Sequence, residues 1–71
     1  DSIKINVFSK EHRPPHIHAE YNEYEVLLII ENFEIYAGYL PKNQLRQANN
    51  WLHDNQEWAM TVFYELNPEL L

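Results

Sequence analysis

The chain has no cysteine among its 71 residues, and it has a single glycine, Gly38. Without cysteine it can form no disulfide, no thiol nucleophile and no metal site built on thiolates. With one glycine it cannot form a glycine-rich phosphate-binding loop. Ser2 and Ser9 lie in no pattern typical of a serine–histidine–aspartate triad. These absences leave histidine and carboxylate side chains as the candidates for chemistry.

The sequence also lacks a long apolar segment. Its longest apolar run is Val26–Ile30, whereas a helix needs about 20 apolar residues to span a bilayer. No signal-peptide pattern is present. We therefore expect a cytoplasmic protein with no membrane contact. The first residue is Asp1 rather than Met, and we expect that a natural N-terminal segment is missing from the sequence.

The length predicts one domain, residues 1–71. Such a chain lies close to the lower limit at which a hydrophobic core alone stabilises a fold. Hydrophobic residues make up 45% of the chain, which is typical of a packed globule. Because no disulfide is available, we expect additional stabilisation from a small protein partner, from a homo-oligomer or from a metal ion.

The net charge of −6 is unevenly distributed. Residues 1–18 hold three of the five Lys and Arg residues and three of the four histidines. Residues 19–41 hold five glutamates and no Lys or Arg. An acidic body repels nucleic acid at long range, so nucleic acid is a candidate partner only for the N-terminal third and is disfavoured by the total charge.

Four segments have the pattern of β-strands. A polar loop with the adjacent prolines Pro14 and Pro15 separates the first two, and Asn22 favours a tight hairpin between the second and third. The third contains the apolar run and is expected to be the central, most buried strand. Gly38 indicates a bulge or bend in the fourth. We predict strands over residues 3–8, 16–21, 24–31 and 33–40.

The C-terminal third has a helical pattern. Pro41 ends the last strand and suits the first position of a helix, and apolar residues then recur at helical spacing over residues 42–66. Asp54 and Glu57 have the spacing of an N-terminal capping box, which predicts that a second helix begins there. One continuous helix over residues 42–66 is the alternative. The predicted fold class is α+β: a four-stranded antiparallel meander followed by one or two C-terminal helices on one sheet face.

The stretch His12–Tyr21 reads H-R-P-P-H-I-H-A-E-Y. Together with Phe8, Glu11, Asn22 and Tyr24 it resembles the pattern F-x-x-D-H-x-P-P-H-F-H-A-x-Y-G-x-Y of a bacterial family of small proteins, domain of unknown function 4160. Glu11 stands where this family usually has Asp, and Asn22 stands where it usually has Gly. The resemblance covers nearly the whole chain and implies the fold and the histidine site. Because members are often encoded beside another small protein, it also suggests a toxin–antitoxin-like pair.

A first hypothesis for the histidines is a metal site. His16 and His18 lie at positions i and i+2 of one strand face, about 6.6 Å apart at Cα, so their imidazoles can converge on one ion. Glu20 continues the row as a third ligand, and His12 can fold back across the prolines. These ligands suit a divalent transition metal such as Zn²⁺. Against this, an H-x-H pattern is common in proteins that bind no metal.

A second hypothesis is a small hydrolase, dependent on metal or on histidine, that acts on RNA. Histidine exchanges protons near neutral pH and can serve as general acid and base. Lys10 and Arg13 would then bind phosphate, and Tyr21 would stack on a base. The candidate catalytic residues are His12, His16 and His18.

A third hypothesis is a binding or regulatory module without catalytic activity. The sheet face that the helices leave uncovered, or the edge of the first strand, would dock a small protein partner or a second copy of the chain. The histidines and prolines would then be structural. We favour this interpretation, with the hydrolase as the alternative. Chemistry at the histidines requires that they lie on the uncovered face of the sheet.

Overall fold

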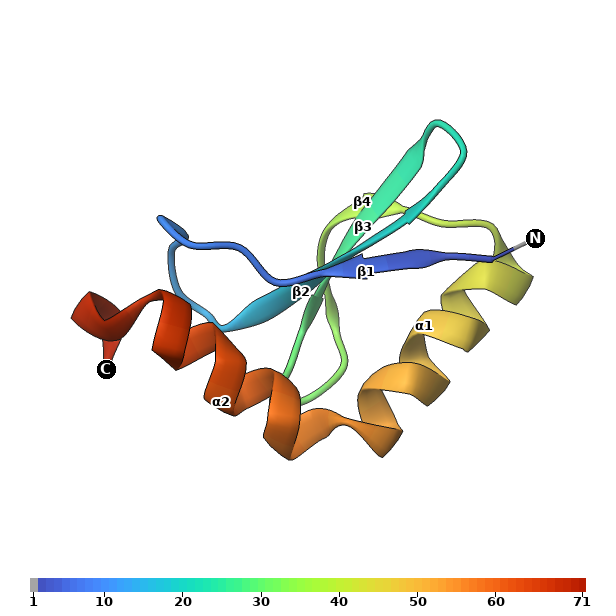
Figure 1. Cartoon of the computed structure of the whole chain (residues 1–71). Helices are drawn as coiled ribbons and strands as arrows, with labels where there is room; N and C mark the ends of the chain where they lie inside the picture. Colours follow the sequence, from blue (N-terminus) through green and yellow to red (C-terminus); the bar gives the residue numbers. More distant parts are fainter. Residues whose placement is uncertain (1) are drawn as a thin grey trace.

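The sheet is the element on which the rest of the fold is built. The computed structural model describes residues 2–71, so Asp1 lies outside the described residues. Four strands follow one another in the order β1-β2-β3-β4, each antiparallel to its neighbour (Figure 1). This confirms the predicted meander, with β2 and β3 as its two central strands. The strands are β1 (Lys4–Asn6), β2 (His16–Tyr21), β3 (Tyr24–Ile29) and β4 (Ile35–Tyr39).

Three of the strands are shorter than predicted, because loop contacts replace strand pairing at their ends. β1 ends before Phe8, whose carbonyl accepts a hydrogen bond from the side chain of Asn67 at 2.8 Å instead of pairing with β2. A turn over residues 30–32 and a short loop over residues 33–34 connect β3 and β4. Within this connection, the amide of Phe33 donates to the carbonyl of Ile29 at 2.8 Å. Residues 30–31, predicted to end β3, and residues 33–34, predicted to begin β4, therefore lie in this connection.

Two helices follow the sheet, which confirms the two-helix alternative. The predicted capping box is wrong, because Asp54 still belongs to the first helix. Asn55 precedes the second helix without a side-chain cap, and its side-chain amide donates to the carbonyl of Trp51 at 2.8 Å. Pro41 lies at the N-cap rather than at the first helical position. The elements are α1 (Lys42–Asp54), α2 (Gln56–Leu66) and a terminal 3₁₀ turn, η1 (Pro68–Leu70).

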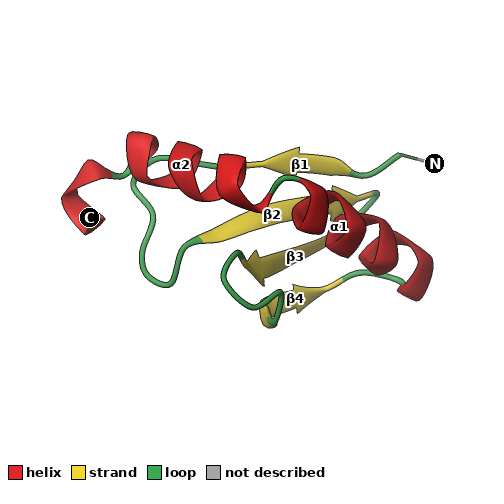
Figure 2. Ribbon diagram, turned by 90° about the horizontal axis from the view of Figure 1, so that it is seen from below, coloured by secondary structure: helices red, strands yellow, loops and turns green. Residues whose placement is uncertain are grey.

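Both helices lie on the same side of the sheet (Figures 1 and 2). The strands send alternate apolar side chains to this side, where they meet apolar side chains of both helices. None of these helices, over residues 2–71, is long and apolar enough to cross a membrane. The buried core consists of Ile17, Ala19, Val26, Leu28, Ile30, Leu40, Ala48, Leu52, Ala59 and Phe63.

The opposite face of the sheet carries the histidines. Because side chains alternate along β2, His16 and His18 project away from the side to which Ile17 and Ala19 point. Neither helix covers this face (Figure 1). His16 and His18 therefore lie on the face that the helices leave uncovered, as chemistry at the histidines requires. The ring of His16, at the start of β2, also contacts Phe63 of α2, with ring centroids 5.7 Å apart.

An irregularity in β4 brings Gly38 close to the backbone of β3. The pairing of the two strands shifts between Leu27 and Leu28, which leaves Tyr36 as an extra residue in β4. Gly38, expected at a bulge or bend, follows this irregularity with a φ of 85°. A Cβ atom at Gly38 would lie 2.1 Å from the carbonyl oxygen of Glu25. Only glycine fits here without displacing one of the strands.

We predict that Gly38→Ala lowers the free energy of unfolding by about 2 kcal/mol or more, because the new Cβ meets backbone at a positive φ. Asn22→Gly is the matched control. Asn22 has a φ of 53°, so glycine relieves strain there, and we expect stability to change by less than about 1 kcal/mol. Urea denaturation followed by circular dichroism measures both values. Wild-type stability of Gly38→Ala would contradict the close approach of β3 and β4.

Candidate metal centre

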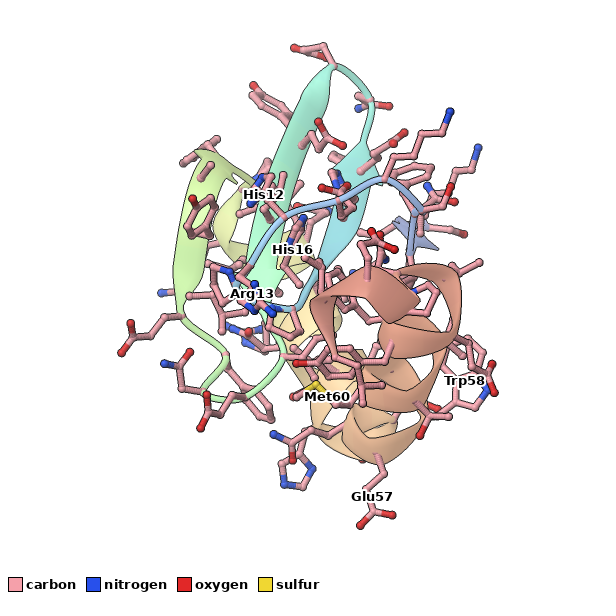
Figure 3. All side chains as sticks on the ribbon, turned by 90° about the vertical axis from the view of Figure 1, so that its left-hand side faces the viewer. His12, Arg13, His16, Glu57, Trp58 and Met60 are labelled. Atoms are coloured by element: carbon pink, nitrogen blue, oxygen red, sulfur yellow. The ribbon has the colours of Figure 1, made fainter. Side chains whose placement is uncertain are left out.

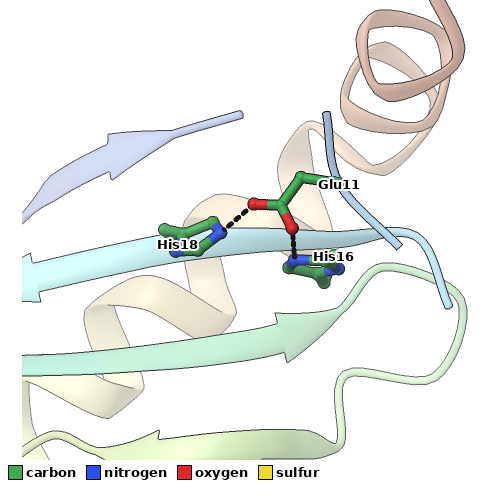
Figure 4. Close-up of side chains that lie close together, drawn as sticks. All are labelled: Glu11, His16 and His18. Atoms are coloured by element: carbon green, nitrogen blue, oxygen red, sulfur yellow. Dashed lines mark hydrogen bonds and ion pairs between the residues drawn. The ribbon is translucent and has the colours of Figure 1, made fainter. Parts of the chain in front are cut away.

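A carboxylate from the loop between β1 and β2 meets two imidazoles of β2. Oε1 of Glu11 lies 3.2 Å from Nε2 of His16, and Oε2 lies 2.7 Å from Nε2 of His18 (Figure 4). One potential ligand atom from each of the three residues lies within 4.8 Å of the other two. Glu11, His16 and His18 thus form one compact cluster, which we call the triad.

A backbone carbonyl fixes which nitrogen of His16 faces the triad. Nδ1 lies 2.8 Å from the carbonyl oxygen of Pro14. A carbonyl oxygen only accepts, so Nδ1 carries the proton and Nε2 of the neutral ring keeps its lone pair. This Nε2 is buried and makes no hydrogen bond within residues 2–71, and its 3.2 Å contact with Oε1 of Glu11 is an ion pair only when the ring is protonated. Buried polar atoms rarely lack a partner, and this one faces an anion.

His18 lies between two carboxylates. Its Nδ1 is 3.0 Å from Oε2 of Glu25 on β3, and its Nε2 contacts Glu11. With a proton on each nitrogen the ring donates to both carboxylates, and with one proton it donates to only one of them. The ring of Phe8 packs edge-on against His18, with centroids 4.7 Å apart. Glu25 therefore orients His18 from behind, much as the Pro14 carbonyl orients His16.

His12 stands at the open edge of the triad, beside His16 (Figure 3). The two rings stack with centroids 5.0 Å apart, and Nε2 of His12 lies 3.9 Å from Oε1 of Glu11. Tyr36 of β4 lies against His12 at a centroid distance of 5.5 Å. The side chain of His12 is 56% exposed, whereas that of His16 is fully buried. Of the three histidines around Glu11, His12 is the one most open to solvent.

Opposing effects act on the Glu11 carboxyl. Burial raises its pKa, but the hydrogen bond from His18 and the charges of His16, His18 and His12 lower it more. The net result is a pKa below the ordinary value of 4.5. Glu11 therefore favours the ionised form, in which a carboxylate can bind a cation.

The C-terminal end of the chain holds the loop in place. Asn67, which follows α2 and is fully buried, accepts a hydrogen bond from the amide of Glu11 at 2.8 Å and donates to the carbonyl of Phe8 at 2.8 Å. The same side chain donates to a carbonyl of α2 at 2.9 Å. Arg13 donates to the carbonyl of Leu70 at 2.7 Å. The backbone position of Glu11 is thus set by residues far away in the sequence.

The structure places the other predicted site residues outside the triad. Glu20, predicted as a ligand, lies further along β2 opposite Glu25 and is not part of the cluster. Tyr21, predicted to stack on a base, packs against the hydrophobic core. Lys10 is exposed with a φ of 60°, and the guanidinium of Arg13 is bonded to η1. Of the metal ligands predicted from the sequence, two belong to the triad.

Sequence reasoning missed Glu11 as a member of the site. A signal was present, because Glu11 directly precedes His12 and stands where the resembling family has Asp. Strand periodicity, however, assigns no face to a loop residue. Glu25 gave no signal of its own, because glutamate at an exposed strand position is usually in contact with solvent only.

The comparisons with known proteins identify a family. A family model described as a domain of unknown function (DUF4160) matches residues 2–63. The chain belongs to this family. The match confirms the family predicted from the sequence, and the DUF4160 description assigns no activity. A search of curated proteins and a search of solved structures found no match.

In this DUF4160 chain, we predict that Asn67→Ala lowers the free energy of unfolding by about 2 kcal/mol or more, because the Glu11 amide and the Phe8 carbonyl lose their partner. Asn50→Ala, at an exposed position of α1, is the matched control, and we expect it to remain within about 0.5 kcal/mol of wild type. Urea denaturation measures both. An equal decrease in the free energy of unfolding in the two variants would show that other contacts hold the loop.

We also predict a pH dependence from Glu11, measured with a chelator present. Because folding lowers its pKa, the ionised carboxylate stabilises the fold above pH 4.5, and this contribution is lost as the pH falls below that value. The stability advantage of wild type over Glu11→Gln should shrink over this range. Glu34→Gln removes an exposed carboxylate and corrects for the change in total charge. A constant advantage at all pH values would contradict the prediction.

Proposed function

We propose that this protein binds a divalent transition-metal ion, with Glu11, His16 and His18 as ligands. One observation carries the proposal: two Nε2 atoms converge on one carboxylate, while each Nδ1 is held by an acceptor behind its ring. Metal-bound histidines commonly have this arrangement, because an acceptor at the second nitrogen fixes the tautomer and raises the basicity of the first.

The spacing of the ligand atoms supports the proposal. In a tetrahedral site with metal–nitrogen distances of about 2.0–2.1 Å, neighbouring ligand atoms lie about 3.3 Å apart. The distance of 3.2 Å between Oε1 of Glu11 and Nε2 of His16 agrees with this value. Nε2 of His18 is closer, at 2.7 Å from Oε2, as a hydrogen bond requires. A metal ion would replace that hydrogen bond after a shift of less than about 1 Å.

Electrostatics also favour a cation among these atoms. When both rings are neutral with their protons on Nδ1, the triad presents two lone pairs and a carboxylate to one shared space. A proton bridges one pair of these atoms, whereas a divalent ion contacts all three at once. Nε2 of His16 is shielded from water, and a buried polar atom without a partner costs about 1–3 kcal/mol.

The donor set narrows the choice of metal. Two imidazoles and a carboxylate, in a chain without cysteine, suit Zn²⁺, Fe²⁺ or Mn²⁺ better than a soft ion such as Cu⁺. A metal-dependent RNA hydrolase would need a coordination position open to water or substrate. The hydrolase, the toxin–antitoxin-like pair and a homo-oligomer remain predictions from the sequence.

The test is calorimetric titration of tag-free, metal-free protein with Zn²⁺, Mn²⁺ and, without oxygen, Fe²⁺. We expect one ion per chain. His16→Ala and His18→Ala should each weaken binding at least about tenfold, because each removes a ligand. Saturating metal should also raise the thermal midpoint of unfolding. At a free metal concentration of one hundred times the dissociation constant, binding stabilises the fold by about 2.7 kcal/mol.

His53→Ala is the matched control for these variants. His53 lies on α1 with a side chain that is 77% exposed, and it contacts the neighbouring Asp54 rather than the triad. Its removal should leave the affinity unchanged. The proposal is wrong if the wild-type protein binds none of these ions, or if His53→Ala weakens binding as much as His16→Ala.

A further inference from the structure

His12 has the orientation of a metal ligand although it lies outside the triad. Its Nδ1 is 3.0 Å from the carbonyl oxygen of Arg13. This oxygen only accepts, so in the neutral ring Nδ1 carries the proton and Nε2 keeps its lone pair. Nε2 lies 3.9 Å from Oε1 of Glu11. His12 therefore repeats the pattern of His16, in which a backbone carbonyl holds Nδ1 and Nε2 faces the carboxylate.

Neighbouring rings hold His12 over the triad. The ring stacks on His16 with 29° between the planes, and Tyr36 of β4 lies against it at a tilt of 43°. Nε2 needs to approach Oε1 of Glu11 by about 0.6 Å to reach the ligand spacing of a tetrahedral site. It must also move closer to the histidines of the triad, because His12 lies outside the cluster of ligand atoms within 4.8 Å of one another. Because the side chain is 56% exposed, a small change of its rotamer disturbs no packed core.

We infer that His12 is the fourth protein ligand of the metal site, so that three histidines and one glutamate enclose a tetrahedral ion of the Zn²⁺ type. The inference rests on the proposed metal site. Four protein ligands leave no coordination position for water, and closed sites of this kind are structural, whereas catalytic zinc sites keep one position open. The ion would then fasten the loop to β2 rather than activate water for hydrolysis.

The origin of the four ligands supports this role. Glu11 and His12 come from the loop, and His16 and His18 come from β2, so the ion joins two segments that no disulfide can join in this chain. Three ligands are buried or nearly so, and His12 alone is largely open to solvent. Release of His12 therefore opens a route for the ion without disturbing the sheet.

Co²⁺ in place of Zn²⁺ provides the test, because its visible absorption reports the coordination number. We expect a four-coordinate spectrum in the wild-type protein. His12→Ala should weaken Co²⁺ and Zn²⁺ binding at least about tenfold. Its spectrum and X-ray absorption should indicate two imidazoles and an added water. His53→Ala, exposed on α1, is the matched control and should leave affinity and spectrum unchanged.

A cysteine at the same position tests direct contact with the ion. Thiolate is a strong ligand of zinc-type ions, so His12→Cys should give a thiolate-to-Co²⁺ charge-transfer band. His53→Cys should give none. Circular dichroism of each variant establishes that the fold is retained, as expected for substitutions of exposed side chains.

The outcomes separate this inference from the proposal beneath it. The inference is overturned, while the metal site stands, if His12→Ala binds Co²⁺ with wild-type affinity and spectrum and His12→Cys shows no charge-transfer band. If the wild-type protein binds neither Zn²⁺ nor Co²⁺, the inference and the proposed metal site are both wrong.

Discussion

The buried amide of Asn67 is the contact on which the site depends. It joins the end of α2 to the loop after β1. Its Oδ1 accepts a hydrogen bond from the backbone amide of Glu11, and its Nδ2 donates to the carbonyl of Phe8. Neither group has a strand partner, because β1 ends before reaching them. Since buried backbone groups need partners, the loop keeps this path as long as α2 is docked on the sheet. The docking of α2 on one face of the sheet thereby fixes the position of the Glu11 carboxylate on the opposite face.

The two faces of the sheet carry side chains of different kinds, apolar on one face and polar around the histidines on the other. Alternation along β2 gives Ile17 and Ala19 to the core and His16 and His18 to the uncovered face. The core side is satisfied mainly by apolar burial. On the other side, polar groups must satisfy one another, and each histidine there has an acceptor at Nδ1 and the Glu11 carboxylate at Nε2. This arrangement is complete only when a cation, whether protons or a metal ion, lies between the imidazoles and the carboxylate.

The fold was largely readable from the sequence, because meander and helices follow from local periodicity. Alternation identified the strands. The break near Asn55 was predicted as one of two alternatives from the spacing of Asp54 and Glu57, although the capping box itself does not form. The errors lie at the ends of elements, where contacts between distant residues act. Phe8 was assigned to β1, but its carbonyl bonds to Asn67. Asp54 was assigned to a cap, but helical hydrogen bonding continues through it. No local pattern records such contacts.

The sequence by itself determined that His16 and His18 share one face, because the period of a strand is two residues. Only the tertiary structure decided that Glu11, rather than Glu20, is the carboxylate between them. Glu20 obeys the strand period and is carried away along β2. Glu11 is held beside the histidines by the hydrogen bond from its backbone amide to Asn67, which is 56 positions further along the chain. A loop residue has no periodicity that assigns its direction, so its place depends on the packing of the whole molecule.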